Sequence, residues 1–178
     1  MAVSRESRAE LFRMLSGGDR RSIGRVDEVM ATVEATPELY ALLLDGLQHT
    51  DPIVRMRAAD AAEKLSAVHP GWLQPHKTLL FDLASGSGQQ EVRWHLALML
   101  PRLSLTQEER RLAASIMEGY LEDKSAIVRA NALEGMAALA VQDMALRAPV
   151  LKQLESALQS PSAAVRSRAR RLLQWLTK

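Results

Sequence analysis

Residues 125–140, SAIVRANALEGMAALA, form a segment whose pattern recurs through the chain. The segment begins with a Val-Arg pair and continues with apolar residues at helical spacing. Three other segments repeat it: DPIVRMRAADAAEKL at 51–65, QQEVRWHLALMLPRL at 89–103 and PSAAVRSRARRLLQWL at 161–176. The four valines of these pairs, Val54, Val92, Val128 and Val165, lie 38, 36 and 37 residues apart. A fixed period of this size is typical of stacked supersecondary units.

Within each unit, apolar or small residues recur at offsets 0, +4, +7 and +11 from the valine. This spacing places them on one face of an α-helix. Small residues at +4 and +7 predict close approach of neighbouring helices. Because a single helical pair cannot bury its apolar face alone, the repetition predicts that each unit covers the next. The positions are Val54, Ala58, Ala61 and Leu65; Val92, Leu96, Met99 and Leu103; Val128, Ala132, Gly135 and Leu139; and Val165, Ala169, Leu172 and Leu176.

The segments between these helices also carry helix-start signals. An N-cap residue precedes a proline at Thr36-Pro37, Asp51-Pro52 and Ser160-Pro161. Thr106 and Glu109 have the spacing of a capping box, as do Ser7 and Glu10. The expected helical pairs are 37–48 with 52–67, 72–85 with 89–102, 107–122 with 126–140, and 144–159 with 161–177, preceded by a degenerate pair at 5–16 and 22–35.

The repeated core resembles that of HEAT and HEAT-like repeat proteins, including the phycobilin-lyase type. It reads Val-Arg-x-x-(Ala/Leu) and occurs at Val54-Arg55, Val92-Arg93, Val128-Arg129 and Val165-Arg166. The resemblance implies an all-α, right-handed, armadillo-like α-solenoid of about five helical hairpins. The family often has an aspartate six residues before the arginine, forming a ladder between repeats. Here only Asp123 fits, and His49, Ser87 and Ser160 occupy the other positions.

The expected organisation is a single domain over residues 1–178. Its first part, 1–35, is a degenerate helical pair or cap, with Ser22-Ile23 where Val-Arg is expected. The four repeats are expected at 36–70, 71–104, 105–141 and 142–178.

Composition and charge narrow the possible functions. The net charge of +2 combines +3 over residues 1–25, −6 over 26–161 and +5 over 162–178. This distribution disfavours a long basic groove for nucleic acid and leaves a local patch possible. The chain has no cysteine, which excludes disulfides and thiolate metal sites. The N-terminal residues lack the apolar core of a signal peptide, and no window reaches the length of a membrane span, so we expect a cytoplasmic protein without membrane contact.

Histidine chemistry gives no support for an enzyme. None of the four histidines, His49, His69, His76 and His95, precedes a glutamate, whereas the HEAT-like hydroxylase of deoxyhypusine uses repeated His-Glu pairs. The helical-repeat DNA glycosylases use a catalytic aspartate near aromatic residues, but Leu98 stands one turn after Trp94. We therefore expect a non-enzymatic protein without catalytic residues, metal or cofactor.

The positions that face away from the predicted core indicate where a partner would bind. In HEAT-like arrays the second helices line the concave surface, where offsets +3, +6 and +10 point outward. These positions are polar and varied, as in a protein-binding groove, although solvated helix faces would look the same. We expect an adaptor that binds a protein or peptide of unknown identity through Arg57, Asp60, Lys64, Trp94, His95, Arg102, Asn131, Glu134, Arg168, Arg171 and Trp175.

Two features leave alternatives open. The arginines of the Val-Arg pairs could bind phosphate, but their fixed position favours a structural role. The run Arg166-Ser-Arg-Ala-Arg-Arg171 is either a polar cap of the last repeat or a binding site for an acidic protein surface or a phosphate backbone. Nucleic-acid binding through this C-terminal helix is thus the alternative function.

Overall fold

The computed structural model describes residues 5–19 and 22–178. Over these residues it contains ten α-helices, several 3-10 turns and no strand, so the predicted all-α class is confirmed. Over the same residues, every helix is too short or too polar to cross a membrane. The chain divides into two compact units, Met1–His76 and Lys77–Lys178, which are described in turn. The single domain expected over 1–178 stays a prediction.

In the first unit, the long helix α4 packs against α1, α2 and α3. Its buried core is formed by leucines and valines of the short helices and by the alanine-rich face of α4. The elements are α1 (Arg5–Leu15), α2 (Val26–Ala35), η1 (Pro37–Leu39), α3 (Tyr40–Asp45), η2 (Gly46–Gln48), α4 (Pro52–Val68) and η3 (Pro70–His76).

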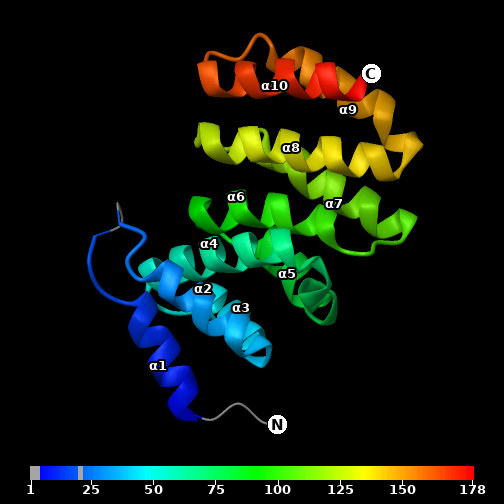
Figure 1. Ribbon diagram of the computed structural model, residues 1–178. Helices are drawn as coiled ribbons and strands as arrows, with labels where there is room; N and C mark the ends of the chain where they lie inside the picture. Colours follow the sequence, from blue (N-terminus) through cyan, green and yellow to red (C-terminus); the bar gives the residue numbers. More distant parts are fainter. Residues whose placement is uncertain (1–4, 20–21) are drawn as a thin grey trace. The chain divides into compact units, whose positions relative to one another are not determined.

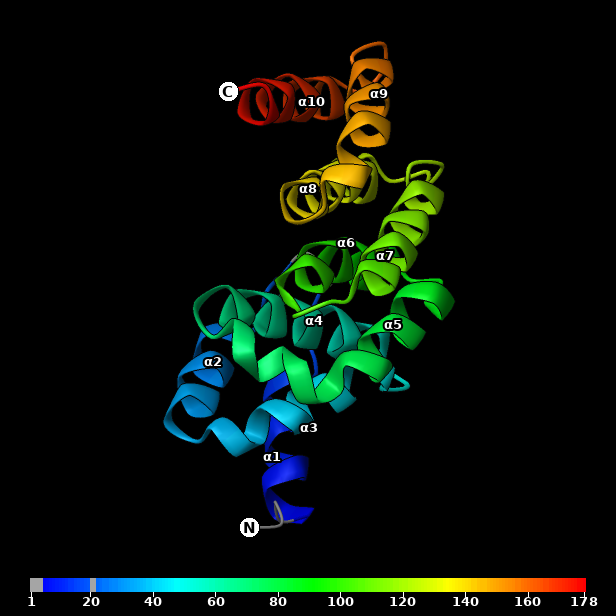
Figure 2. The ribbon, with the colours of Figure 1, turned by 90° about the vertical axis from the view of Figure 1, so that its right-hand side faces the viewer.

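The second unit is a stack of three helical pairs in two layers. Helix α8 lies between α6 and α10 in one layer, while α5, α7 and α9 form the other (Figures 1 and 2). The elements are α5 (Lys77–Gly86), α6 (Gln90–Met99), η4 (Leu100–Arg102), α7 (Gln107–Tyr120), α8 (Ala126–Gln142), η5 (Met144–Leu146), α9 (Arg147–Ala157) and α10 (Ala163–Leu176).

The predicted core face of the second helices is confirmed. All sixteen residues at offsets 0, +4, +7 and +11 from the four valines are buried, including the leucine at the end of each face; Leu103 lies just beyond α6 and η4. The period of the sequence therefore determined which side of each helix is covered.

Some helix starts were predicted correctly and others were wrong. Asp51 caps α4, and Thr106 with Glu109 forms the capping box of α7. Helix α10 begins two residues later than expected, because Ser162 rather than Ser160 is its N-cap. Ser7 lies inside α1 and Thr36 makes no side-chain capping bond. The first helices of three pairs begin with 3-10 turns, so their α-helical parts, α3, α5 and α9, are shorter than predicted.

The arginines of the Val-Arg pairs all bind the loop that precedes their own helix. Each donates to the main-chain carbonyl six residues earlier: Arg55 to His49 at 2.6 Å, Arg93 to Ser87 at 2.6 Å, Arg129 to Asp123, and Arg166 to Ser160 at 2.7 Å. This contact ties each inter-helix loop to the first turn of a second helix. The repeated arginines therefore have the structural role that their regularity indicated.

The side chain six residues before each arginine also has a constant role. In every unit it accepts a hydrogen bond from the N–H two residues later, although its chemistry changes, and this closes a local turn. The pairs are His49 Nδ1 with Asp51 N at 3.0 Å, Ser87 Oγ with Gln89 N at 3.3 Å, Asp123 Oδ1 with Ser125 N at 2.8 Å, and Ser160 Oγ with Ser162 N at 3.3 Å. His49, Ser87 and Ser160, which replace the family's aspartate, therefore still close the local turn before the second helix.

Gly135 shows why a small residue is required at offset +7 of α8. A Cβ at this position would lie 2.3 Å from the carbonyl oxygen of Ala97 and 2.7 Å from Sδ of Met117. The glycine therefore allows α8 to contact α6 and α7 at once. The expectation that small residues permit close helix approach is confirmed here.

We expect Gly135→Ala to lower the free energy of unfolding by about 1–3 kcal/mol, because overpacking outweighs the roughly 1 kcal/mol gain in helix propensity. Gly119→Ala in α7 is the matched control, since nothing lies within 4 Å of its added Cβ. Urea denaturation of both variants checks this, and a Gly135→Ala protein as stable as Gly119→Ala would contradict it.

Candidate functional site

The expectation that Arg57 faces a partner is wrong, because its side chain is buried. Arg57 is 2% exposed, and its guanidinium donates to the main-chain carbonyls of Leu15, Ser16, Gly17, Asp19 and Ser22 at 2.6–3.3 Å. Several of these carbonyls belong to the C-terminal end of α1, where a positive charge is favoured. Arg57 thus holds the α1–α2 loop and does not contact solvent.

Three glycines let the loop close around this guanidinium. Gly17, Gly18 and Gly24 have φ values of +74°, +75° and +59°, a region that L side chains rarely adopt. A Cβ on Gly24 would lie 2.7 Å from the guanidinium carbon of Arg57. The Gly17-Gly18 pair, which the sequence marked as a helix stop, therefore supplies the left-handed backbone of the loop, while Gly24 makes room for the buried cation.

We expect Arg57→Met to destabilise the protein by about 3 kcal/mol or more, since the variant leaves several buried carbonyls without a donor. Arg13→Met on α1 removes an exposed i,i+3 pair with Glu10 and should change stability by less than about 1 kcal/mol. Thermal melting followed by circular dichroism compares the two. Equal melting temperatures would contradict the assigned role of Arg57.

The other two site residues predicted on α4 lie side by side. Lys64 Nζ is 2.8 Å from Asp60 Oδ2 in an i,i+4 ion pair, and both side chains are partly exposed. Their binding role stays a prediction.

In the second unit, five predicted site residues, four through their side chains and Trp94 through its main chain, form one hydrogen-bonded ladder across the second helices. Asn131 of α8 donates through Nδ2 to the carbonyl of Trp94 on α6 at 3.2 Å. Its Oδ1 accepts from Nη1 of Arg168 on α10 at 3.4 Å, and the same nitrogen donates to Glu134 Oε2 at 2.7 Å. Arg171 donates to that carboxylate oxygen as well. We call Trp94, Asn131, Glu134, Arg168 and Arg171 the polar ladder.

The polar ladder is ordered and yet accessible. The side chains of Arg168 and Glu134 are each 29% exposed, and that of Arg171 is 60% exposed. Asn131 and Arg168, and likewise Glu134 and Arg171, are 37 residues apart, which is the repeat period between α8 and α10, whereas Glu134 and Arg168 are 34 residues apart. Sequence reasoning identified Asn131, Glu134, Arg168 and Arg171 from the offsets and Trp94, at offset +2, as a separate candidate anchor. It could not identify which of these residues bind one another.

The remaining predicted residues flank the polar ladder. Trp94 and His95 are half-buried and contact each other edge to face at 5.7 Å. Arg102 lies in η4 and is partly exposed. Trp175 on α10 is 50% exposed, and Val141 at the end of α8 is 56% exposed. Val141 was not among the predicted residues, and its position three residues beyond offset +10 is the only sequence signal for it.

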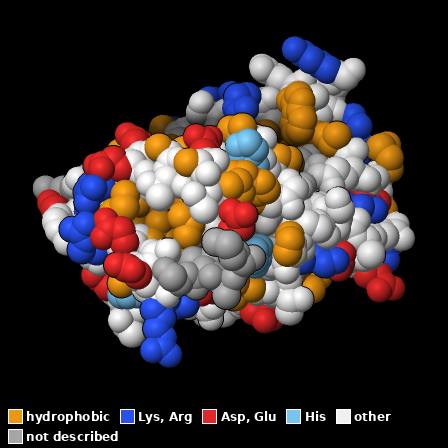
Figure 3. Space-filling view, turned by 60° about the horizontal axis from the view of Figure 1, so that its bottom comes forward, with side chains coloured by type: hydrophobic (Ala, Val, Ile, Leu, Met, Phe, Trp, Pro, Cys, Tyr) orange, Lys and Arg blue, Asp and Glu red, His pale blue; other side chains and the backbone are white. Residues whose placement is uncertain are grey.

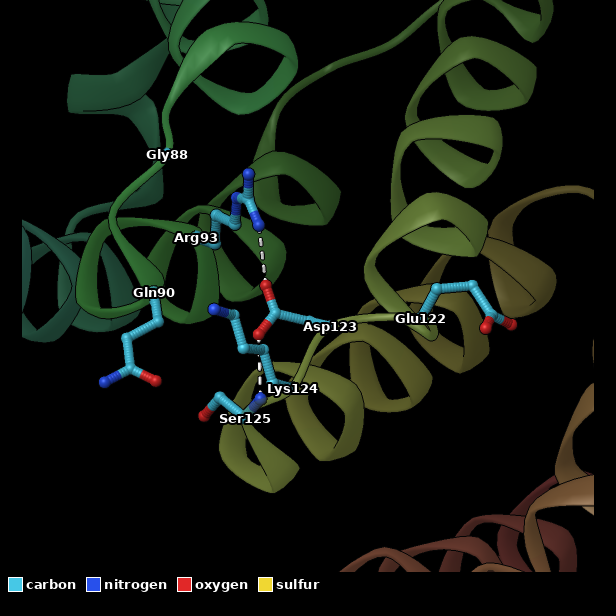
Figure 4. Close-up of a pocket in the computed structure, with 7 residues that line it drawn as sticks. All are labelled: Gly88, Gln90, Arg93, Glu122, Asp123, Lys124 and Ser125. Carbon is cyan, nitrogen blue, oxygen red and sulfur yellow. Dashed lines mark hydrogen bonds and ion pairs between the residues drawn. The ribbon is translucent and has the colours of Figure 1, made fainter.

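A surface pocket lies at the opposite, N-terminal ends of α6 and α8 (Figure 4). Its volume is about 600 Å³ and its centre is the ion pair between Arg93 Nη1 and Asp123 Oδ2 at 2.6 Å. This ion pair corresponds to the contact between repeats that the family's aspartate makes. Among His49, Ser87, Asp123 and Ser160, only Asp123 has a second oxygen left to accept from Arg93 after closing its local turn. The lining residues are Gly88, Gln90, Arg93, Glu122, Asp123, Lys124 and Ser125.

The electrostatics of Asp123 favour its charged form. Burial by itself raises the pKa of Asp123, but hydrogen bonds from the Ser125 N–H and the Arg93 guanidinium outweigh burial. The pKa of the carboxyl is therefore below its ordinary value. Both carboxylate oxygens of Asp123 accept hydrogen bonds from the chain itself, one from Arg93 and one from Ser125. The carboxylate at the centre of the pocket therefore stabilises the contact between α6 and the α7–α8 loop.

We expect Asp123→Asn to lower stability at neutral pH and to lose this effect in acid. A lowered folded-state pKa stabilises the fold above the unfolded pKa, and this contribution disappears as pH falls below about 4. Denaturant unfolding of the wild type and the variant across this pH range checks the expectation. A stability difference that stays constant with pH would contradict it.

Among the residues that the structure describes, no group of three or more His, Asp or Glu side chains is arranged to hold a metal ion.

The comparisons with known proteins identify the fold. No protein-family model matches the chain, and no curated protein is significantly similar in sequence. A solved structure of the CpcE–CpcF complex of phycocyanin lyase from Nostoc sp. PCC7120 matches with a TM-score of 0.69 at 17% identity, over 95% of this chain and 99% of that chain. An engineered protein matches with a TM-score of 0.60 at 19% identity, over 97% of this chain and 80% of that chain. Cex1p matches at 0.59 and 16%, over 98% of this chain and 36% of that chain.

These likenesses confirm the HEAT-like helical-repeat solenoid as the architecture. At such low identity they show the fold alone. The right-handedness of the array and the roles of the individual site residues stay predictions.

Proposed function

We propose that the chain is a non-enzymatic scaffold or adaptor that binds a protein or peptide along α6, α8 and α10. The observation that carries this proposal is the polar ladder. In it, partly exposed side chains of α8 and α10 hold one another in place, and Asn131 of α8 also binds the main chain of α6. Arginine, tryptophan and asparagine in such an array can form directional hydrogen bonds and bury aromatic area in a partner.

Order before binding favours recognition. Long side chains that are already held by hydrogen bonds lose less rotamer freedom when a partner arrives. Arg168 is fixed by both Asn131 and Glu134, so part of the entropic cost of binding is met within the free protein. On a helix face that only contacts solvent, which is the alternative that the sequence left open, Arg168 and Arg171 would be mobile.

The comparison with CpcE and CpcF supports a protein as the partner. In that structure two proteins form a complex, and one of them has the same fold as this chain over nearly its whole length. The phycocyanin lyase activity named for that complex is not transferred to this chain by fold likeness. We expect the adaptor to act in the cytoplasm, as its sequence suggested.

Nucleic-acid binding by α10 is the weaker candidate. Four arginines and no acidic residue lie on this helix, which favours phosphate contacts. Glu134, however, pairs with two of these four arginines, so fewer of them are left for the run of phosphates that nucleic-acid binding needs. Figure 3 is seen from the bottom of Figure 1, whereas α10 is drawn at its top; on this other face the described acidic and basic side chains are interspersed.

We expect photo-crosslinking groups on the second helices to capture a protein from nuclease-treated native extract. Replacing Ala138 of α8 or Trp175 of α10 with a benzophenone amino acid tests the proposed surface. Arg111 of α7 and Lys152 of α9, exposed on first helices, are the matched control positions. The same protein captured at the first two positions and absent at the controls would support the proposal.

Capture at all four positions, or at the control positions alone, would contradict a binding surface on the second helices. Capture from untreated extract that disappears after nuclease treatment would assign the surface to nucleic acid.

A further inference from the structure

One stripe of α10 combines positive charge with exposed aromatic area. Arg168, Arg171 and Trp175 follow one another at i, i+3 and i+7, so they lie on the same side of the helix. Arg171 is 60% exposed and Trp175 is 50% exposed. Arginine and tryptophan are the residue types that most often dominate binding energy in protein interfaces.

The chain itself shows which ligand group fits between the two arginines. The carboxylate of Glu134 accepts from Arg168 at 2.7 Å and also from Arg171. A single carboxylate leaves most of the five N–H donors of each guanidinium unused. Because Arg171 is largely exposed, its remaining donors can reach a second carboxylate from a partner.

The charge around this stripe is strongly positive. Residues 162–178 have five basic residues and no acidic one, and Glu134 is the acidic side chain whose ion pairs with them the structure records. An acidic partner would therefore meet complementary charge along the Arg166–Arg171 part of α10, which steers association and selects against basic partners.

Exposed apolar side chains accompany these arginines on α8 and α10. Trp175 occupies the position that follows Ala138 of α8 by 37 residues, the same separation that joins Asn131 to Arg168 and Glu134 to Arg171. Ala138 is partly exposed, and Val141, three residues further along α8, is 56% exposed, so apolar side chains are accessible on both helices. Arg171 and Trp175 are one helical turn apart, which is about 6 Å along the axis.

We propose that the stripe of Arg168, Arg171 and Trp175, with Ala138 and Val141, binds an acidic amphipathic helix of a partner protein. This helix would place an aspartate or glutamate on Arg171 and a leucine or other large apolar side chain on Trp175, one turn apart. The proposal rests on the proposed scaffold function and adds the chemical class of the partner. A protein helix fits better than nucleic acid, because it supplies both the carboxylate and the apolar group that this surface accommodates.

The experiment measures binding of defined probes to the full chain by fluorescence anisotropy. The first probe is a labelled helical peptide with glutamate and leucine on one face at i and i+4. The second is the same peptide with every glutamate replaced by glutamine. The third is a single-stranded oligothymidine of similar length.

We expect the glutamate peptide to bind at least about tenfold more tightly than the glutamine peptide. Arg171→Glu should weaken binding by about tenfold, and Arg171→Ala and Trp175→Ala by several-fold. Lys152→Glu, a charge reversal exposed on α9, should leave the affinity unchanged.

Equal binding of the two peptides, or wild-type affinity of both Arg171 variants, would overturn the proposal. Tighter binding of the oligothymidine with a steep salt dependence would overturn it in favour of nucleic acid. If no peptide binds while crosslinking at Ala138 captures a protein, the acidic-helix proposal fails and the scaffold function stands. If crosslinking fails as well, both proposals fail.

Discussion

The main-chain carbonyl six residues before each repeated arginine fixes where a second helix begins. Its hydrogen bond to the arginine holds the loop against the helix, and the adjacent valine is buried in the core. Together these two contacts set the rotation of every second helix about its axis. With the rotation set, the outward positions of successive helices fall into register, and the polar ladder follows from that register.

The ladder shows how a structural repeat produces a surface. Packing constrains offsets 0, +4, +7 and +11, but it leaves +3, +6 and +10 free to vary. In the second unit, asparagine, glutamate and two arginines at these free positions find one another across helices. Substitutions at these surface positions leave the packing of the core unchanged, so the chemistry of the surface can be adapted to a partner without changing the fold.

The same offset can have opposite roles in the two units. Arg57 and Arg168 both lie at offset +3, but Arg57 is enclosed by carbonyls of the α1–α2 loop while Arg168 is part of the accessible ladder. The difference arises from the neighbouring element. A loop with three glycines at positive φ can fold over a guanidinium, whereas a packed helix with an asparagine and a glutamate leaves it partly open to solvent.

The sequence by itself determined the class of fold, the period and the buried face, because helical periodicity and turn chemistry are local properties. Every position of the predicted core face is buried, and the starts of α4 and α7 follow from their capping residues. Helices that begin with 3-10 turns were predicted too long, since these turns have nearly the same local residue preferences. Burial of Arg57, partners within the ladder and the Arg93–Asp123 ion pair depended on contacts between residues 30–42 apart. Only the tertiary structure could decide these, because a hydrogen bond across helices depends on the distance and direction that packing imposes.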